Sequence, residues 1–178
     1  MASSKLDSFE HLTIEIVNKN DRNIILTSMY RPPATDMQQF IQDTSELLKL
    51  INTKRNKKKI IVAGDFNVDL LKINDHVKTN DFLNTLISYS LIPTIVRPTR
   101  ITDNTAALID NIFVDIGYIV HSSGIIYDDL SDHFPTFTEL LLKNPLSDNP
   151  HLPSENETHD RRSFTKSNFD KFYSLLNI

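Results

Sequence analysis

The chain begins with apolar and polar positions that alternate with a period of two. Residues 12–17 follow this alternation, which predicts a half-buried strand. Residues 18–21 are polar and residues 23–30 predict a second strand, so the two strands are expected to pair as a hairpin. A further apolar run, residues 60–63, ends at a glycine, as a buried strand does where it reaches the edge of a sheet.

Two segments have apolar residues at the spacing of a helix. The first is expected to begin at Asp36, since aspartate is a favoured N-cap residue, and the second covers residues 80–90. Additional strands are expected at residues 107–114 and 134–142. Because strands and helices alternate along the chain, the sequence predicts an α/β fold with a central sheet.

The composition changes near residue 144, which divides the chain into three parts. Residues 1–143 are expected to form the folded domain. Residues 144–159 are rich in Pro, Ser, Asn and acidic residues and contain almost no apolar side chain, which predicts a disordered linker. Residues 160–178 regain aromatic residues at helical spacing and are expected to start an amphipathic helix of a following region.

Composition and charge exclude several classes of protein. The 178 residues include no cysteine, which excludes disulfides, thiolate zinc sites and cysteine nucleophiles. No apolar run approaches the roughly 20 residues that a membrane-spanning helix needs, and the first residues lack a secretion signal, so an intracellular protein of nucleus or cytoplasm is expected. The net charge of −4 does not indicate a nucleic-acid-binding protein, although a local basic patch can still bind DNA. The basic residues 54–59 are interpreted first as a solvated loop.

Polar side chains that could take part in a reaction lie in or directly after two of the predicted strands. Asp65 and Asn67 come directly after the buried run, and in an extended backbone both would leave on the same face while Phe66 points into the core. Asp110 lies within an apolar strand, where a carboxylate needs a partner. His133 is the obvious candidate, since a carboxylate fixes the tautomer of an imidazole and favours its charged form.

These motifs resemble a known group of enzymes. Residues 64–67 (Gly-Asp-Phe-Asn), 109–113 (Ile-Asp-Asn-Ile-Phe) and 131–135 (Ser-Asp-His-Phe-Pro) occur in the order seen in the endonuclease/exonuclease/phosphatase superfamily. With residues 30–33 (Tyr-Arg-Pro-Pro) and 98–102 (Pro-Thr-Arg-Ile-Thr), the chain is most similar to the endonuclease domain of a non-LTR (LINE-type) retrotransposon. Each motif alone would be weak, whereas the ordered set is specific.

The resemblance implies a magnesium-dependent phosphodiesterase that nicks DNA to start target-primed reverse transcription. Asp65 would deprotonate the attacking water, and Asn67 would position water and phosphate. His133, held by Asp110, would contact the scissile phosphate and stabilise its developing charge, which agrees with the general chemistry of such sites. Further roles that the resemblance implies are a phosphate contact by Tyr30, a metal contact by Asp132, and substrate contacts by Asn111, Arg100 and either Thr99 or Thr102.

The resemblance also implies that part of the family fold is missing. The family has an N-terminal half that supplies one sheet of a four-layer α/β sandwich and the glutamate that is the principal metal ligand. The resemblance here spans only about residues 9–142, the C-terminal half, and neither Glu10 nor Glu15 lies in a similar motif. The expectation is therefore a truncated fragment that is inactive alone, binds Mg²⁺ poorly, and belongs with a missing N-terminal half and a downstream reverse transcriptase.

Two alternatives remain open from the sequence. The fragment could be a non-catalytic remnant that serves as a binding module or has no role. It could also belong to a branch of the superfamily that cleaves RNA or phosphoinositides, although residues 30–33 and 98–102 favour the retroelement branch.

Overall fold

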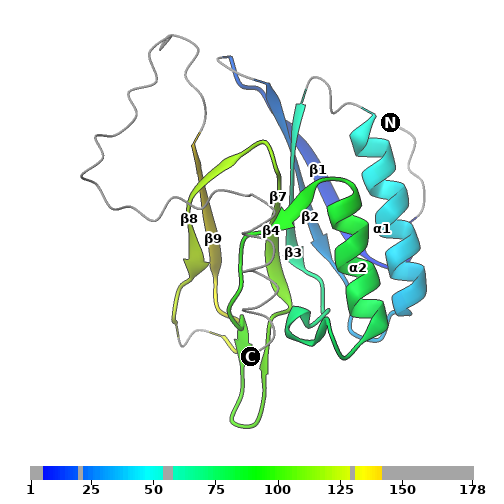
Figure 1. The fold of residues 1–178 in the computed structure, drawn as a ribbon, viewed down its shortest axis with the longest axis vertical. Coiled ribbons are helices and arrows are strands. Elements are labelled where there is room, and N and C mark those ends of the chain that lie inside the picture. The colour runs from blue at the N-terminus through cyan, green and yellow to red at the C-terminus, as the bar shows by residue number, and fades with distance from the viewer. Residues whose placement is uncertain (1–5, 20–21, 54–57, 129–130, 142–178) are drawn as a thin grey trace.

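A five-stranded mixed sheet forms the centre of the protein (Figure 1). The structure, a computed structural model, describes residues 6–19, 22–53, 58–128 and 131–141. The strands lie in the order β1 (Glu10–Ile16), β2 (Asn23–Tyr30), β3 (Lys58–Asp65), β7 (Asp110–Asp115) and β4 (Leu91–Pro93). β2 and β3 are parallel, and the other neighbours are antiparallel. The expected β1–β2 hairpin and the α/β class are confirmed.

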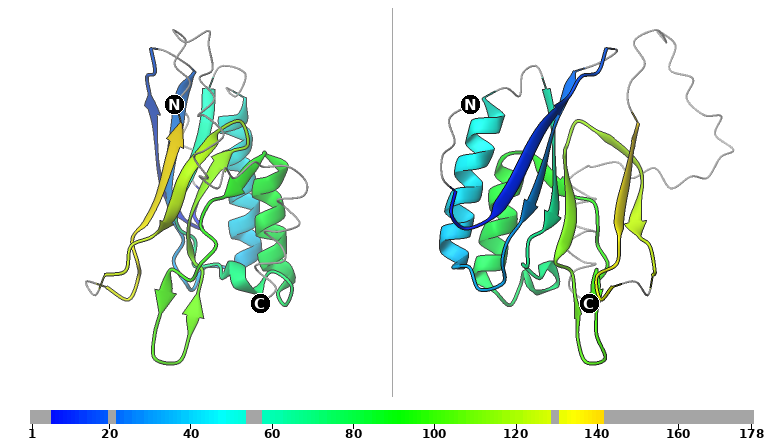
Figure 2. Two further views of the ribbon diagram at one scale, coloured as in Figure 1. Left: turned by 60° about the vertical axis from the view of Figure 1, so that its left-hand side comes forward. Right: turned by 180° about the vertical axis from the view of Figure 1, so that it is seen from behind.

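Two helices cover one face of this sheet (Figure 2). Helix α1 (Met37–Asn52) begins as expected, because the Asp36 carboxylate accepts a hydrogen bond of 2.8 Å from the Gln39 amide. Helix α2 (Val77–Ser88) begins three residues earlier than its apolar spacing indicates, and the structure shows no side-chain cap at His76. A 3₁₀ turn, η2 (Leu70–Lys72), lies in the connection between β3 and α2.

Aromatic rings fill the space between the helices and the sheet. Phe40 of α1 stacks on Phe82 of α2 with ring centroids 5.2 Å apart. Phe66, directly after β3, contacts both Phe82 and Phe113 of β7, at 5.5 and 5.3 Å. All four rings are at most 2% exposed. Aromatic pairs with offset or edge-to-face geometry gain about 0.5–1.5 kcal/mol beyond simple burial, so this cluster fixes the ends of β3 and β7 relative to both helices.

A hairpin of β8 (Ile119–Ile125) and β9 (Thr136–Leu141) packs against the opposite face of the sheet (Figure 2). Its Val120 and Leu140 contact Ile24, Ile92 and Val114 in a second, smaller core. A short ribbon of β5 (Arg100–Ile101) and β6 (Ala106–Ala107) projects beyond one end of the sheet (Figure 1).

Strand β1 differs from its expected half-buried state, since each of its seven residues is exposed. Its apolar residues pair with β2 on the face opposite the helices, and there Leu12, Ile14 and Ile16 are 67%, 45% and 42% exposed. The alternation therefore has the correct period, but no described segment covers this edge of the sheet. The patch formed by Leu12, Ile14 and Ile16 is called the β1 apolar face below.

Other sequence expectations need smaller corrections. β7 begins at Asp110 rather than at residue 107, because Ala106 and Ala107 pair with β5 instead. Strands β4, β5, β6 and β8 were not expected, as they are short or lack regular alternation. The expected linker at 144–159 and helix at 160–178 lie outside the described residues. Within the part of the chain that the structure describes, no helix has the length and apolar character to cross a membrane.

The exposure of β1 predicts a contrast between two leucine substitutions. Leu83→Ala removes a side chain that is 0% exposed and is expected to lower the unfolding free energy by about 2–5 kcal/mol. Leu12→Ala is expected to change it by less than about 0.5 kcal/mol, as for an exposed position. Urea denaturation of both variants tests this. A loss from Leu12→Ala as large as that from Leu83→Ala would mean that the β1 apolar face is buried in solution.

Candidate active site

Three polar side chains form a row across the ends of three neighbouring strands. Tyr30 of β2 pairs in register with Asp65 of β3, and Asp65 pairs in turn with Asp110 of β7. Paired residues of neighbouring strands direct their side chains to the same side of a sheet. All three therefore lie on the face opposite the helices, at the end from which the β5–β6 ribbon projects (Figure 1).

Gly64 allows β2 and β3 to approach closely beside this row. A Cβ atom at Gly64 would lie 1.8 Å from the Met29 carbonyl oxygen, and the φ angle of Gly64 is 156°. Any other residue would push the two strands apart next to Tyr30 and Asp65. The glycine of the 64–67 motif is thus required by packing.

The turn after β3 departs from the extended geometry expected for residues 65–67. Phe66 points into the core as expected, but Asn67 has a φ of 48° in the left-handed region. Its backbone N–H donates to the Asp65 carboxylate at 3.0 Å, and its side-chain amide donates to the Arg31 carbonyl at 2.8 Å. The amide is therefore held against Arg31, and the carboxylate is held by the turn itself.

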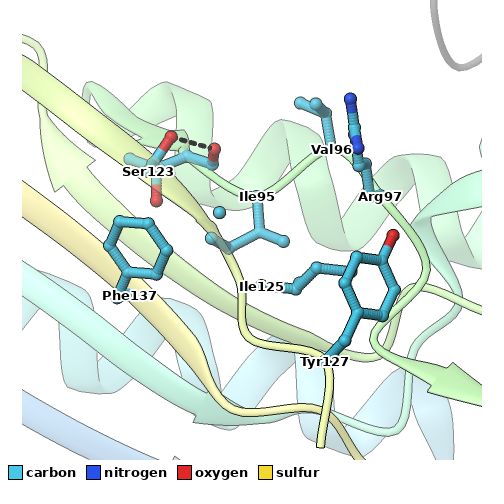
Figure 3. Close-up of a pocket in the computed structure, with 9 residues that line it drawn as sticks. Ile95, Val96, Arg97, Ser123, Ile125, Tyr127 and Phe137 are labelled. Carbon is cyan, nitrogen blue, oxygen red and sulfur yellow. Dashed lines mark hydrogen bonds between the residues drawn. The ribbon is translucent and has the colours of Figure 1, made fainter.

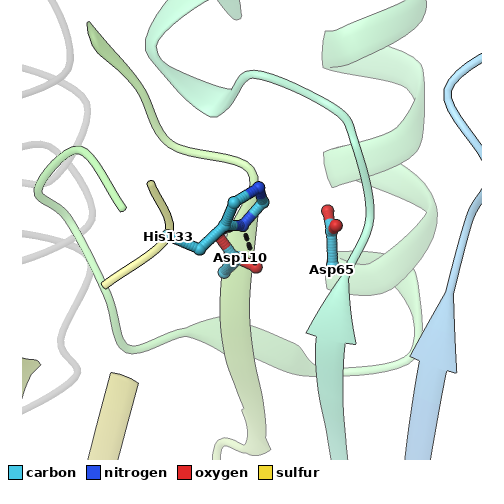
Figure 4. A group of neighbouring side chains, drawn as sticks. All are labelled: Asp65, Asp110 and His133. Atoms are coloured by element: carbon cyan, nitrogen blue, oxygen red, sulfur yellow. Dashed lines mark hydrogen bonds and ion pairs between the residues drawn. The ribbon is translucent and has the colours of Figure 1, made fainter. Parts of the chain in front are cut away.

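His133 lies over the row and bonds to Asp110 (Figure 4). Its Nδ1 is 3.0 and 3.2 Å from the two Asp110 carboxylate oxygens. The backbone fixes this approach, since His133 forms a β-bridge with Arg100 and the Phe134 amide donates to the Thr99 carbonyl at 2.7 Å. The carboxylate thus orients the imidazole so that its Nε2 faces away from Asp110.

Asp65 is ionised less readily than an ordinary aspartate. Partial burial raises the pKa of Asp65, and the nearby Asp110 charge raises this pKa further, while the Asn67 amide and the His133 charge act in the opposite direction. A carboxylate whose pKa is raised is a stronger base when ionised. It can accept a proton from a water molecule placed between itself and the imidazole.

Asp65, Asp110 and His133 each offer one atom within 4.8 Å of the others, which is the spacing of a metal-binding group. The Asp110 carboxylate, however, already bonds to the His133 ring. Asp132, expected near the metal, is not in this group. Its carboxylate accepts a 2.7 Å bond from Arg100, and that bond is the main cause of its lowered pKa. Among the described residues, the side chains that could together hold a metal ion are therefore Asp65, Asp110 and His133.

The remaining expected substrate contacts lie in different environments. Asn111 is 2% exposed, and its amide bonds to the backbone of Thr94 and Ile95. Thr99 is 0% exposed, and its hydroxyl accepts from the amides of Ile109 and Asp110. Both side chains are therefore bonded to backbone groups, and their roles as substrate contacts stay predictions. Thr102 and Arg100 are exposed on the β5–β6 ribbon, where the Thr102 hydroxyl bonds to Thr105.

A cavity of about 290 Å³ lies near the site, between the segment after β4 and the β8–β9 hairpin (Figure 3). Ile95 and Ile125 lie between Phe137 on one side and Arg97 and Tyr127 on the other. Tyr127 also packs edge-to-face on Phe134, the residue after His133, with centroids 5.2 Å apart. The cavity wall therefore supports the backbone that positions the histidine.

Comparison with solved structures identifies the class of fold. The chain resembles the endonuclease domain of TRAS1, a telomere-specific non-LTR retrotransposon, with a TM-score of 0.56 and 19% identity over 75% of this chain and 64% of that one. It resembles an endonuclease/exonuclease/phosphatase family protein from Leptotrichia buccalis, with a TM-score of 0.53 and 21% identity over 74% of this chain and 53% of that one. The fold is that of the endonuclease/exonuclease/phosphatase superfamily.

The particular family follows from the sequence itself. Residues 24–137 match the model of the endonuclease-reverse transcriptase family, and the chain belongs to that family. A comparison with curated proteins gives no significant match. Another structure with this fold is the Neisseria 3′ phosphatase NExo bound to a product DNA hairpin, with a TM-score of 0.51 and 15% identity over 73% of this chain and 65% of that one. The chain spans between about half and two thirds of the length of these structures.

The raised pKa of Asp65 predicts that this carboxylate lowers the stability of the fold. The folded state binds the Asp65 proton more tightly than the unfolded chain, so ionisation favours unfolding as the pH rises above the unfolded-state pKa of about 3.9. Asp65→Asn is therefore expected to raise the melting temperature at pH 7, with a gain that shrinks towards pH 4. Calorimetry across this range tests it, with Asp75→Asn as an exposed control. An equal gain at both pH values would contradict the assignment.

The burial of Asn111 predicts a structural effect of its removal. Asn111→Ala leaves the buried Ile95 amide without its acceptor, so a loss of roughly 1–3 kcal/mol of unfolding free energy is expected. Denaturant titration measures this loss. If Asn111→Ala is as stable as the parent chain, the amide does not hold the 94–95 segment and is available for other contacts.

Proposed function

We propose that this chain contains the catalytic side chains of a metal-dependent phosphodiesterase that nicks DNA to start target-primed reverse transcription. The observation that supports it most directly is the row of Tyr30, Asp65 and Asp110 with His133 bonded over it. These groups lie at one end of the sheet and suit one reaction. The carboxylate can act as a base towards water, the oriented imidazole can stabilise charge on the phosphate, and the phenol can contact a phosphate oxygen.

In this proposal Asp65 accepts a proton from the water that attacks phosphorus. The water oxygen forms the new bond to phosphorus, and the bond from phosphorus to one ester oxygen of the DNA strand breaks, so that this oxygen leaves as an alkoxide and takes a proton from solvent. His133, oriented through its Nδ1 by Asp110, donates from Nε2 to a phosphate oxygen. The Tyr30 hydroxyl contacts another phosphate oxygen, and Asn67 and Arg100 contribute polar contacts at either side of the site.

Mg²⁺ is the metal that we propose, and when bound it would neutralise phosphate charge and polarise the phosphoryl group. Asp65, Asp110 and His133 are the described residues that could hold it. Mg²⁺ prefers oxygen ligands in octahedral geometry, whereas the Asp110 and Asp132 carboxylates are already bonded to His133 and Arg100. We propose that a further ligand comes from chain outside the described residues.

The β1 apolar face supports the same conclusion. Three adjacent aliphatic side chains, Leu12, Ile14 and Ile16, are at least 42% exposed beside the part of the sheet that the β8–β9 hairpin covers. Contiguous exposed apolar surface normally marks a contact with another body. We propose that the rest of the domain covers this face and supplies the missing ligand, so the chain alone does not turn over.

A plasmid-nicking assay in Mg²⁺ tests both parts of the proposal. The chain alone is expected to give no nicking above background. A chimera that places the unmatched part of the TRAS1 endonuclease domain before residue 6 is expected to nick, and Asp65→Ala or His133→Ala in the chimera to reduce the rate by on the order of 10²–10⁴-fold. Asp75→Ala and His76→Ala, an exposed pair at the start of α2, are the matched controls.

Two outcomes would contradict the proposal in different ways. Nicking by the chain alone that both site variants abolish would disprove the need for a further part of the domain. A chimera that folds but does not nick would favour a second candidate, a non-catalytic module that binds through the β1 apolar face.

A further inference from the structure

Arg31 is a buried cation in direct contact with the turn that holds Asp65. It follows β2 and is only 6% exposed. Its backbone N–H donates to the Asp65 carbonyl at 3.0 Å, and its backbone carbonyl accepts the Asn67 side-chain amide at 2.8 Å. The main chain of Arg31 therefore continues the β2–β3 ladder by one residue, to the point where β3 becomes the turn.

The guanidinium group of Arg31 also contacts this turn. Its Nη1 donates to the Asn67 carbonyl at 3.0 Å, and its Nη2 donates to the Thr35 carbonyl at 2.5 Å. The group also lies over the Phe40 ring, with 5.3 Å between Cζ and the centroid. One planar fork thus connects the turn at Asn67 to the loop before α1, while the ring of α1 supports its face. A lysine offers a single point of charge and cannot make both bonds in this geometry.

The burial of this cation is unfavourable by itself. Desolvation is the main cause of the lowered pKa of Arg31, only partly offset by the charges of Asp36 and Asp65. Its Nε has no hydrogen-bond partner among the residues that the structure describes. An apolar side chain of similar volume commonly stabilises a fold as well as a buried ion does. Stability therefore does not explain why a buried arginine occupies this position, whereas its two hydrogen bonds to carbonyl oxygens do.

We propose that Arg31 is a positioning residue, which holds the Asn67 carbonyl and so keeps the left-handed turn that directs the Asn67 N–H at the Asp65 carboxylate. Asn67 has a φ of 48°, a conformation that non-glycine residues adopt rarely unless surrounding contacts hold it. The inference rests on the proposed function only in treating Asp65 as the base.

The test measures the turn itself in the full chain by NMR. Arg31→Met keeps the contact with Phe40 but loses both donors, and Arg31→Lys keeps the charge but loses the fork. Both are expected to accelerate hydrogen exchange of the Asn67 amide. Both are also expected to raise the Asp65 titration midpoint by about one pH unit, because the carboxylate loses a charge-assisted hydrogen bond. Ile51→Val, a core change in the last turn of α1, is the control that lowers stability without altering either signal.

The two variants separate positioning from simple charge. If Arg31→Lys keeps the parent Asp65 midpoint and Asn67 exchange rate, the charge alone is sufficient and the positioning role is disproved. If neither variant alters the turn, the contact is incidental and the proposal is also wrong. Since these signals need no nicking activity, failure of the proposed function would leave the result interpretable.

Discussion

The pairing of β3 with β7 places two carboxylates directly opposite each other. In this register Asp65 faces Asp110 at the last pair of the ladder. Like charges in such a position destabilise a sheet, and a slip of β7 by one residue would move Asp110 to the helix-covered face, away from Asp65. The structure accommodates the pair by bonding one of them, Asp110, to an imidazole, while partial burial raises the pKa of the other, Asp65. This constraint determines where the proposed catalytic side chains are located.

The surrounding structure holds that register from both sides. On the helix side, Phe66 and Phe113 are neighbours in the aromatic cluster, so the ends of β3 and β7 share one packing unit. On the other side, Thr99 accepts from the Asp110 amide and its carbonyl accepts from Phe134, which brings His133 to Asp110. Gly64 lets β2 approach, and this adds Tyr30 to the row. Most residues near the candidate site therefore contribute by fixing the backbone geometry around it.

The sequence is sufficient for the features that depend on local pattern. The strand before Gly64, the cap at Asp36 and the pairing of Asp110 with His133 all follow from residue type and spacing. Register and tertiary burial do not. The burial of Asn111 depends on a contact with Thr94 and Ile95, and the exposure of β1 depends on which segments cover the sheet. Arg31 was not singled out by sequence reasoning, although a lone arginine between an apolar strand and two prolines is a signal that could identify it.

The proposed function requires a phosphodiester to bind between Asp65 and His133. The most direct measurement is an NMR titration of the chain with the dinucleotide d(TpT), in which the ring C–H resonances of the histidines are followed. The His133 resonances are expected to shift in a saturable manner, while those of the exposed His11 and His76 are not. Saturable shifts at His11, beside the Leu12 position of β1, with no change at His133, would contradict it.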